Sequence, residues 1–291
     1  MTLPPPVPGQ RLDVEGNACW TAGQGPPLVL VHTVNAAASA AEVRPLFEHA
    51  MATRTVYAPD LPGFGSSQRG PRDYTPRLMT DAVLATVRAA RARHGDAPLP
   101  VLGVSLGCEF VARAASEQPA WFERLVLVSP TGLNGGELRR GTPGSTRQVP
   151  GMLPILSVPL WSQALFGGLT KPGVVRYFLE RTWGGKDIDE AMCDYAVRTA
   201  REPGARHAPL AFLSGKLFSA DIGSVYDGLA LPVWASHGTR GDFTDYRAKA
   251  HLAGRPNWRF TVYEGGALPY FEHREAFAAA LDAFLAGREA T

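Results

Sequence analysis

The sequence predicts an α/β protein: a doubly wound, mostly parallel sheet interrupted by an inserted helical cap. Three observations support this fold class. Short apolar runs alternate with helical patterns over roughly the first 130 residues, the alternation stops for about 100 residues, and it resumes near Pro232. Continuous apolar runs are typical of strands buried on both faces, and strand–helix alternation is typical of a parallel sheet covered by helices.

The expected elements follow one another in a regular order. Apolar runs predict strands at residues 28–31, 55–58, 101–104, 125–128, 232–235 and 260–263. Helical patterns cover residues 36–50, 80–92, 109–117 and 274–286. We assign residues 1–130 and 228–291 to the sheet domain and residues 131–227 to the cap. Within the cap, aromatic-rich pieces at residues 161–166, 174–183 and 188–201 predict further helices.

Composition narrows the class of protein. The chain has 291 residues, of which 45% are hydrophobic and 19% charged, with a net charge of +2. Without a basic block, nucleic acid is not an expected partner. No apolar run approaches the roughly 20 residues that a membrane span needs. The three cysteines are odd in number and far apart, and the first residues lack a signal-peptide pattern, so we expect a cytoplasmic protein without disulfides.

Metal and cofactor motifs are missing from the sequence. It has no clustered His, Cys and Asp set, no phosphate-binding Gly-rich loop before Lys-Ser or Lys-Thr, and no dinucleotide fingerprint after a strand. We therefore expect neither a metal nor a cofactor, and a small molecule as the binding partner. The oligomeric state stays open.

The most informative motif is Gly103-Val104-Ser105-Leu106-Gly107. It follows an apolar run and opens a helical pattern, which predicts a strand, a sharp turn carrying a serine, and a helix. Such a turn needs small residues two positions before and after the serine, and Gly103 and Gly107 provide them. The serine hydroxyl is then exposed at the positive end of a helix.

Together with three other segments, this motif resembles the α/β-hydrolase superfamily. Residues 31–35 (Val-His-Thr-Val-Asn) stand where that family has its oxyanion loop. Residues 60–67 match its D-x-P-G-x-G-x-S turn, and residues 232–245 look like its acid-bearing segment. The resemblance implies a serine that attacks an acyl carbonyl, a histidine that takes the proton, and an acid that orients the histidine.

The resemblance assigns most catalytic roles to residues of this chain. Ser105 is the expected nucleophile, and the backbone N–H of Leu106 is one expected oxyanion-hole donor. The second donor is Val34 or Thr33, where the threonine replaces the family's usual glycine. Asp242 is the expected orienting acid, with Asp245 as its competitor.

The expected histidine is absent from its motif. Residues 264–272 align with the family's last loop on both sides, but Ala267 occupies the position of the base. Loss of the base costs a serine triad roughly six orders of magnitude in turnover. Ala267 is either natural or an engineered replacement of histidine, and the sequence leaves this open.

If the chain is active as it stands, another group must accept the proton. Glu109 lies one helical turn after Ser105, where burial would raise the pKa of its carboxyl group. His237 ends a predicted strand at the catalytic edge of the sheet. Both are candidates for a substitute base.

We expect an esterase-like hydrolase of a small or medium apolar ester or acyl compound, or else a ligand-binding or non-hydrolytic (lyase- or cyclase-like) member of the fold. Aromatic residues of the cap are expected to line the substrate pocket: Trp161, Phe166, Tyr177 and Trp183.

Overall fold

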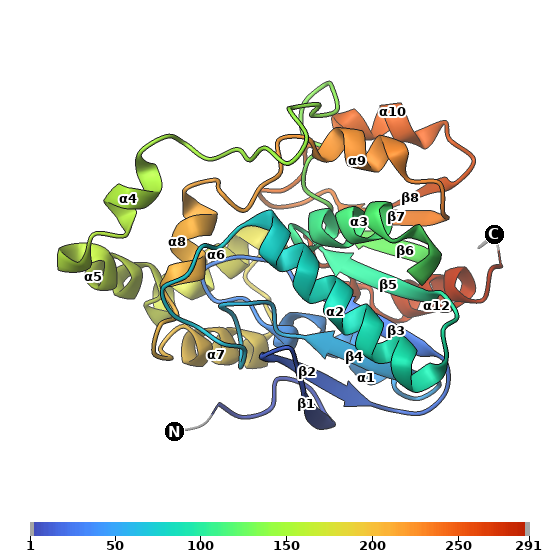
Figure 1. The fold of residues 1–291 in the computed structure, drawn as a ribbon, viewed down its shortest axis with the longest axis horizontal. Coiled ribbons are helices and arrows are strands. Elements are labelled where there is room, and N and C mark those ends of the chain that lie inside the picture. The colour runs from blue at the N-terminus through green and yellow to red at the C-terminus, as the bar shows by residue number, and fades with distance from the viewer. Residues whose placement is uncertain (1–2, 289–291) are drawn as a thin grey trace.

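Residues 3–288 are described in the computed structural model, and one eight-stranded sheet organises them (Figure 1). The strand order is β1-β2-β4-β3-β5-β6-β7-β8. The strands are β1 (Gln10–Val14), β2 (Asn17–Ala22), β3 (Pro27–Val31), β4 (Thr55–Pro59), β5 (Leu99–Val104), β6 (Phe122–Val128), β7 (Val233–Gly238) and β8 (Trp258–Tyr263). From β4 to β8 all neighbours pair in parallel, whereas β1 and β2 add an antiparallel edge. The doubly wound parallel sheet is therefore confirmed, and β1 and β2 are additional to the predicted strands.

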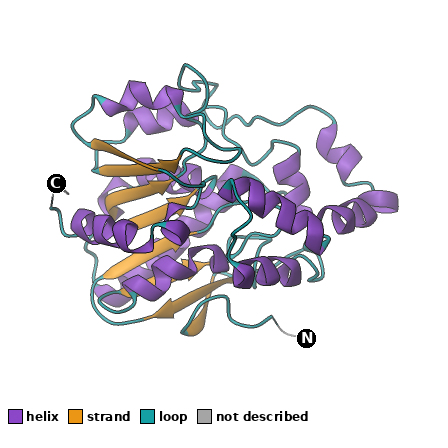
Figure 2. Cartoon of the chain, turned by 180° about the vertical axis from the view of Figure 1, so that it is seen from behind, coloured by secondary structure: helices purple, strands orange, loops and turns teal. Residues whose placement is uncertain are grey.

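Helices cover both faces of the sheet, as the view from behind shows (Figure 2). One face packs against α2 (Pro76–His94), α3 (Gly107–Glu117) and α9 (Ile222–Gly228). The other packs against α1 (Arg44–Ala50) and α12 (Arg274–Leu285). Successive side chains of β5 point to opposite faces of the sheet. Val101 packs in the hydrophobic core on the first face, and Leu102 packs in the core on the second.

Five helices lie between Thr146 and Ser219, among the described residues after β6: α4 (Met152–Leu156), α5 (Pro159–Leu169), α6 (Pro172–Trp183), α7 (Glu190–Thr199) and α8 (His207–Leu213). The chain enters and leaves this segment at one place, where Thr146 and Ser219 form an antiparallel bridge. α4 and α5 lie far from the sheet in both ribbon views (Figures 1 and 2). The helix α9 packs against α3, so it lies with the sheet layers although the predicted cap range of 131–227 includes it.

Shorter elements complete the chain: η1 (Ala40–Val43), η2 (Pro119–Trp121), η3 (Arg247–Lys249), α10 (Ala250–Ala253) and α11 (Pro269–Glu272). The helix predicted over residues 36–50 is in fact a loop followed by η1 and α1. Ser39 ends the loop by accepting a hydrogen bond from the Ala41 N–H, and Pro45 opens α1.

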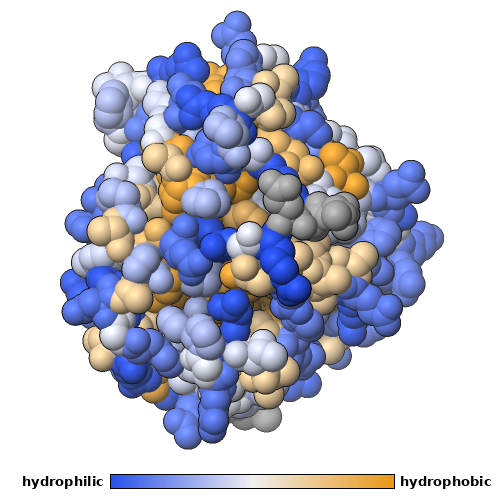
Figure 3. Space-filling model, turned by 90° about the vertical axis from the view of Figure 1, so that its right-hand side faces the viewer, coloured by the Kyte–Doolittle hydropathy of each residue, from blue (hydrophilic) through white to orange (hydrophobic). Residues whose placement is uncertain are grey.

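The outer surface is mixed in character. At the end of the molecule opposite α4 and α5, hydrophilic residues surround smaller areas of hydrophobic ones (Figure 3). No helix within residues 3–288 combines the length and the apolar character required to cross a membrane.

Candidate active site

Ser105 occupies a strained turn between β5 and α3. Its φ angle is +52°, a left-handed conformation that non-glycine residues seldom adopt. The Ser105 N–H donates to the Val128 carbonyl oxygen at 2.7 Å, and its own carbonyl accepts from the Cys108 N–H at 3.1 Å. A Cβ atom on Gly107 would lie 2.4 Å from the carbonyl oxygen of His32. Glycine is therefore required at that position for helix α3 to approach the loop after β3.

Two backbone N–H groups beside Ser105 are available to a ligand. Within residues 3–288, neither the Leu106 N–H nor the Val34 N–H donates to a protein acceptor, and both residues line the cavity over Ser105. The Thr33 N–H donates to the Glu42 carboxyl group at 3.1 Å. Thr33 as an oxyanion-hole donor is thus wrong, because its N–H is already used, and Val34 remains the candidate.

The loop that carries Val34 is held from below by two buried polar side chains. His32 accepts a hydrogen bond from the Leu61 N–H at 2.9 Å and donates to the Thr33 carbonyl oxygen. Asp60 accepts from the Ala40 N–H at 2.8 Å and from the Ser66 N–H at 2.9 Å. These contacts join the loops after β3 and β4, so the D-x-P-G-x-G-x-S turn supports the loop that carries Val34, and residues 60–67 are not among those that line the cavity.

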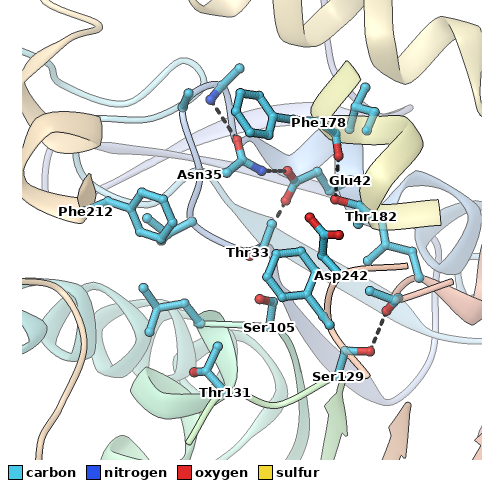
Figure 4. A pocket seen from close by; sticks show the side chains of 18 of the residues that line it. Thr33, Asn35, Glu42, Ser105, Ser129, Thr131, Phe178, Thr182, Phe212 and Asp242 are labelled. Carbon is cyan, nitrogen blue, oxygen red and sulfur yellow. Dashed lines mark hydrogen bonds between the residues drawn. The ribbon is translucent and has the colours of Figure 1, made fainter. Parts of the chain in front are cut away.

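A cavity of about 610 Å³ lies between the sheet edge and the inserted helices. Its walls are mainly apolar and its floor contains Ser105, as the close-up shows (Figure 4). The apolar lining includes Leu169, Val175, Phe178, Leu179, Met192, Phe212 and Phe218. Such a space fits a small or medium-sized organic molecule.

The four aromatic residues predicted to line this cavity do not do so. Trp161 and Tyr177 are 44% and 50% exposed, Phe166 packs on Ala200 and Ala205, and Trp183 is buried against Phe271. The cause is helix phase. On α6 the cavity-facing positions are 175, 178, 179 and 182, at the spacing of one helix face, and Tyr177 and Trp183 fall outside that face.

Asp242 and Asp245 both line the mouth of the cavity, and both are engaged. The Arg181 guanidinium of α6 donates to both carboxylate oxygens of Asp242, one of them at 2.7 Å. Asp245 accepts from the Gly135 N–H at 2.9 Å and from Arg247, whose hydrogen bonds hold the pKa of Asp245 below its usual range. Arg181 thus occupies Asp242, the residue predicted to orient a histidine.

Ala267 is buried and lines the same cavity. Its N–H donates to the Thr182 carbonyl oxygen at 2.9 Å, and its carbonyl oxygen accepts from the Ser129 hydroxyl at 2.6 Å. No histidine is among the cavity-lining residues of the described chain.

His237 as a substitute base is wrong, because both of its ring nitrogens are used. Nδ1 donates to the Gly238 carbonyl oxygen at 2.9 Å, and Nε2 accepts from the Lys249 ammonium group at 2.7 Å. The ring also stacks on Tyr246. Burial lowers the pKa of His237, and so does Lys249. The side chain is a packed part of the core outside the cavity lining.

Glu109 is buried beneath the cavity, and both of its oxygens have partners. It accepts from the Thr131 hydroxyl at 2.6 Å and from the Ser219 N–H at 2.8 Å. Burial raises the pKa of Glu109 to about 7. The carboxyl group thereby ties α3 to the two ends of the inserted segment, and Glu109 itself is not among the residues that line the cavity.

Glu42 is the cavity residue that sequence reasoning missed. It lies in η1, is only 3% exposed, and accepts from the Thr33 N–H and from the Asn35 side-chain amide at 2.7 Å. Burial raises the pKa of Glu42 to about 8. The available signal was an acidic residue inside an otherwise small and apolar stretch, residues 36–43.

Comparison with known proteins gives a consistent result. Residues 26–153 match a family model described as "alpha/beta hydrolase fold". No curated protein sequence matches the chain. The family match and the architecture described above agree, and the chain has the α/β-hydrolase fold.

Solved structures with the same fold include three hydrolases. A serine hydrolase involved in carbazole degradation (CarC) is 18% identical, with a TM-score of 0.74 over 96% of this chain and 98% of that one. The 2-hydroxy-6-oxo-6-phenylhexa-2,4-dienoate hydrolase BphD from Rhodococcus sp. strain RHA1 is 19% identical, with a TM-score of 0.68 over 91% and 92%. The N-formylmaleamic acid deformylase Nfo from Pseudomonas putida, solved as a serine-to-alanine variant, is 21% identical, with a TM-score of 0.65 over 94% and 100%. At these identities the likeness concerns the fold.

Proposed function

We propose that this protein is a serine hydrolase that cleaves a small or medium apolar ester or related acyl compound. Ser105 is the nucleophile, and the N–H groups of Leu106 and Val34 hold the oxyanion. The observation that carries the proposal is the strained Ser105 turn, with two unused N–H groups beside it and an apolar cavity above. Donors fixed in this way stabilise the developing negative charge by about 3–4 kcal/mol each.

Hydrolase activity is also the activity after which the structurally similar proteins are named, among them a serine hydrolase and a deformylase. The apolar walls favour an acyl group without formal charge. The cap helices are the elements that select it, because α5, α6, α7 and α8 all contribute lining residues.

The direct test is labelling with a fluorophosphonate probe, followed by hydrolysis of a short nitrophenyl ester. We expect covalent labelling of the wild-type chain and none of Ser105→Ala, with ester turnover lost in the same variant. If wild type and Ser105→Ala behave identically in both assays, the proposal fails. The alternative of a ligand-binding or non-hydrolytic member of the fold would then apply.

A further inference from the structure

We propose that Glu42 is the proton acceptor of this site: its carboxylate takes the Ser105 proton through one bridging water and later takes a proton from the attacking water. The inference rests on the proposed function. It assigns the role of general base, which Ala267, at the position of the expected histidine, cannot perform. The carrying observation is that Glu42 is a buried carboxyl group inside the same cavity as Ser105.

The position of Glu42 follows from the loop after β3. This loop places Val34 beside Ser105, and η1 then turns the chain so that Glu42 lies behind the loop but still lines the cavity. Figure 4 shows the side chains of Glu42, Asp242 and Ser105 around one space. No side chain of the described residues hydrogen-bonds to the Ser105 hydroxyl, and both residues line the same cavity of about 610 Å³, which is large enough to hold water.

Other carboxyl groups near the serine are less suited to accept a proton. Asp242 is bound by the Arg181 guanidinium and its side chain is 38% exposed. Asp245 is bound by Arg247. Glu109 is closed off by Thr131 and Ser219. Among the described residues, Glu42 differs from the two aspartates because its carboxyl group has neutral partners, Thr33 and Asn35, and it differs from Glu109 because it lines the cavity.

These two donors leave part of the carboxyl group free. Each oxygen of Glu42 accepts one hydrogen bond from the loop, and a carboxylate oxygen has room for about two. The remaining lone pair on each oxygen is available to a water. No Lys, Arg or His of the described residues forms an ion pair with Glu42, so its basicity is not reduced by a cation.

Several elements that pack against η1 carry titratable groups. Burial is the main cause of the raised pKa of Glu42, and the negative charge of Asp60 raises it further. The hydroxyl of Tyr270 donates to the Glu42 carbonyl oxygen, not to its side chain. The titratable groups on or beside the elements that pack against η1 also include His32, Arg44, Cys193 and Tyr195. A pKa of about 8 gives Glu42 a basicity in the range that general bases require near neutral pH.

The proton balance closes without any further reactant. In the first half, the Ser105 Oγ–C bond forms, the serine proton passes to Glu42, and the carbonyl electron pair moves to the oxygen held by Leu106 and Val34. The alkoxide leaves and takes the proton from Glu42. In the second half, a water attacks the acyl group and gives its proton to Glu42, and Ser105 leaves with that proton.

The test is the rate of fluorophosphonate labelling of Ser105 between about pH 5.5 and about pH 9.5. For wild type we expect the rate to rise about tenfold per pH unit and to level off near the pKa of about 8. Glu42→Gln keeps the side-chain shape but cannot accept the proton. We expect it to label about 10²–10⁴-fold more slowly, without the rise with pH.

Glu109→Gln is the matched control, because Glu109 is the other buried carboxyl group near Ser105 and lies outside the cavity lining. It should keep the rise with pH. Asn35→Ala is a second variant that does not depend on the folding of Glu42→Gln. Loss of the Asn35 amide removes a donor that favours the charged carboxylate, so the levelling-off should move to higher pH.

The outcomes separate the two proposals. Specific labelling of Ser105 with a pH profile that neither Glu42→Gln nor Asn35→Ala changes overturns the role of Glu42 and leaves the nucleophile in place. A profile that moves with Glu109→Gln instead assigns the proton to Glu109 and also overturns it. No specific labelling of wild type at any pH overturns both.

Discussion

Asp242 and Ala267 line the same cavity, but the ion pair between Asp242 and Arg181 would prevent a histidine at position 267 from completing a catalytic triad. A histidine at position 267 would need Asp242 to accept its ring N–H, and Arg181 already donates to both Asp242 oxygens. Sequence reasoning found both positions but not the arginine. It comes from a cap helix 61 residues away in the sequence, and nothing in a motif indicates such a contact.

Restoring the missing side chain should therefore have its full effect only when Asp242 is released. We expect Ala267→His to raise kcat/KM for a short nitrophenyl ester by about tenfold, and Ala267→His with Arg181→Met by about another tenfold or more. The orienting acid of a serine triad is worth up to about four orders of magnitude. Arg181→Met alone is the control. A double variant no faster than Ala267→His would contradict competition between Arg181 and the new histidine.

At the scale of the element, α6 connects the cap to the sheet domain. Its last residue, Trp183, is buried against Phe271 of α11 with ring centroids 5.2 Å apart. The preceding residue, Thr182, accepts the Ala267 N–H. Another side of the same helix carries Tyr177, which is half exposed. Trp183 therefore anchors the helix, whereas Tyr177 lies on its surface.

This difference predicts unequal effects of truncation on stability. Trp183→Ala should lower the free energy of unfolding by about 3–5 kcal/mol, because a large buried ring leaves a cavity. Tyr177→Ala should change it by about 0.5 kcal/mol, as is usual for surface positions. Urea unfolding followed by circular dichroism measures both. Similar losses in the two variants would show that α6 is not held through its last turn.

At the scale of the whole molecule, the sequence was enough to predict the parallel sheet, because strands buried on both faces form continuous apolar runs such as residues 28–31. It was not enough for β1, which is an edge strand with mostly exposed residues and no such run. In the site, Ser105 was predictable because a local turn determines its place. Glu42 was not, because its burial depends on the distant elements that close over η1.

Stability as a function of pH is a property of the whole chain that follows from its two buried carboxyl groups. The folded-state pKa values of Glu42 and Glu109 are about 8 and about 7, both above the ordinary value of 4.5 that applies to the unfolded chain. At pH values between 4.5 and the folded-state pKa of each group, the folded state binds more protons than the unfolded state. Their contribution is therefore fully present below pH of about 4.5 and is lost as pH rises to about 8.

We therefore expect Glu42→Gln and Glu109→Gln each to gain stability relative to wild type as pH rises from about 5.5 to about 9, by on the order of 1–3 kcal/mol. Urea unfolding at the two pH values measures the change. Glu48→Gln, at an exposed position of α1, removes the same charge without burial and should show a much smaller trend. If the difference between Glu42→Gln and wild type is the same at both pH values, the Glu42 carboxyl group is ionised throughout. Its role as the proton acceptor of Ser105 would then lose its physical basis.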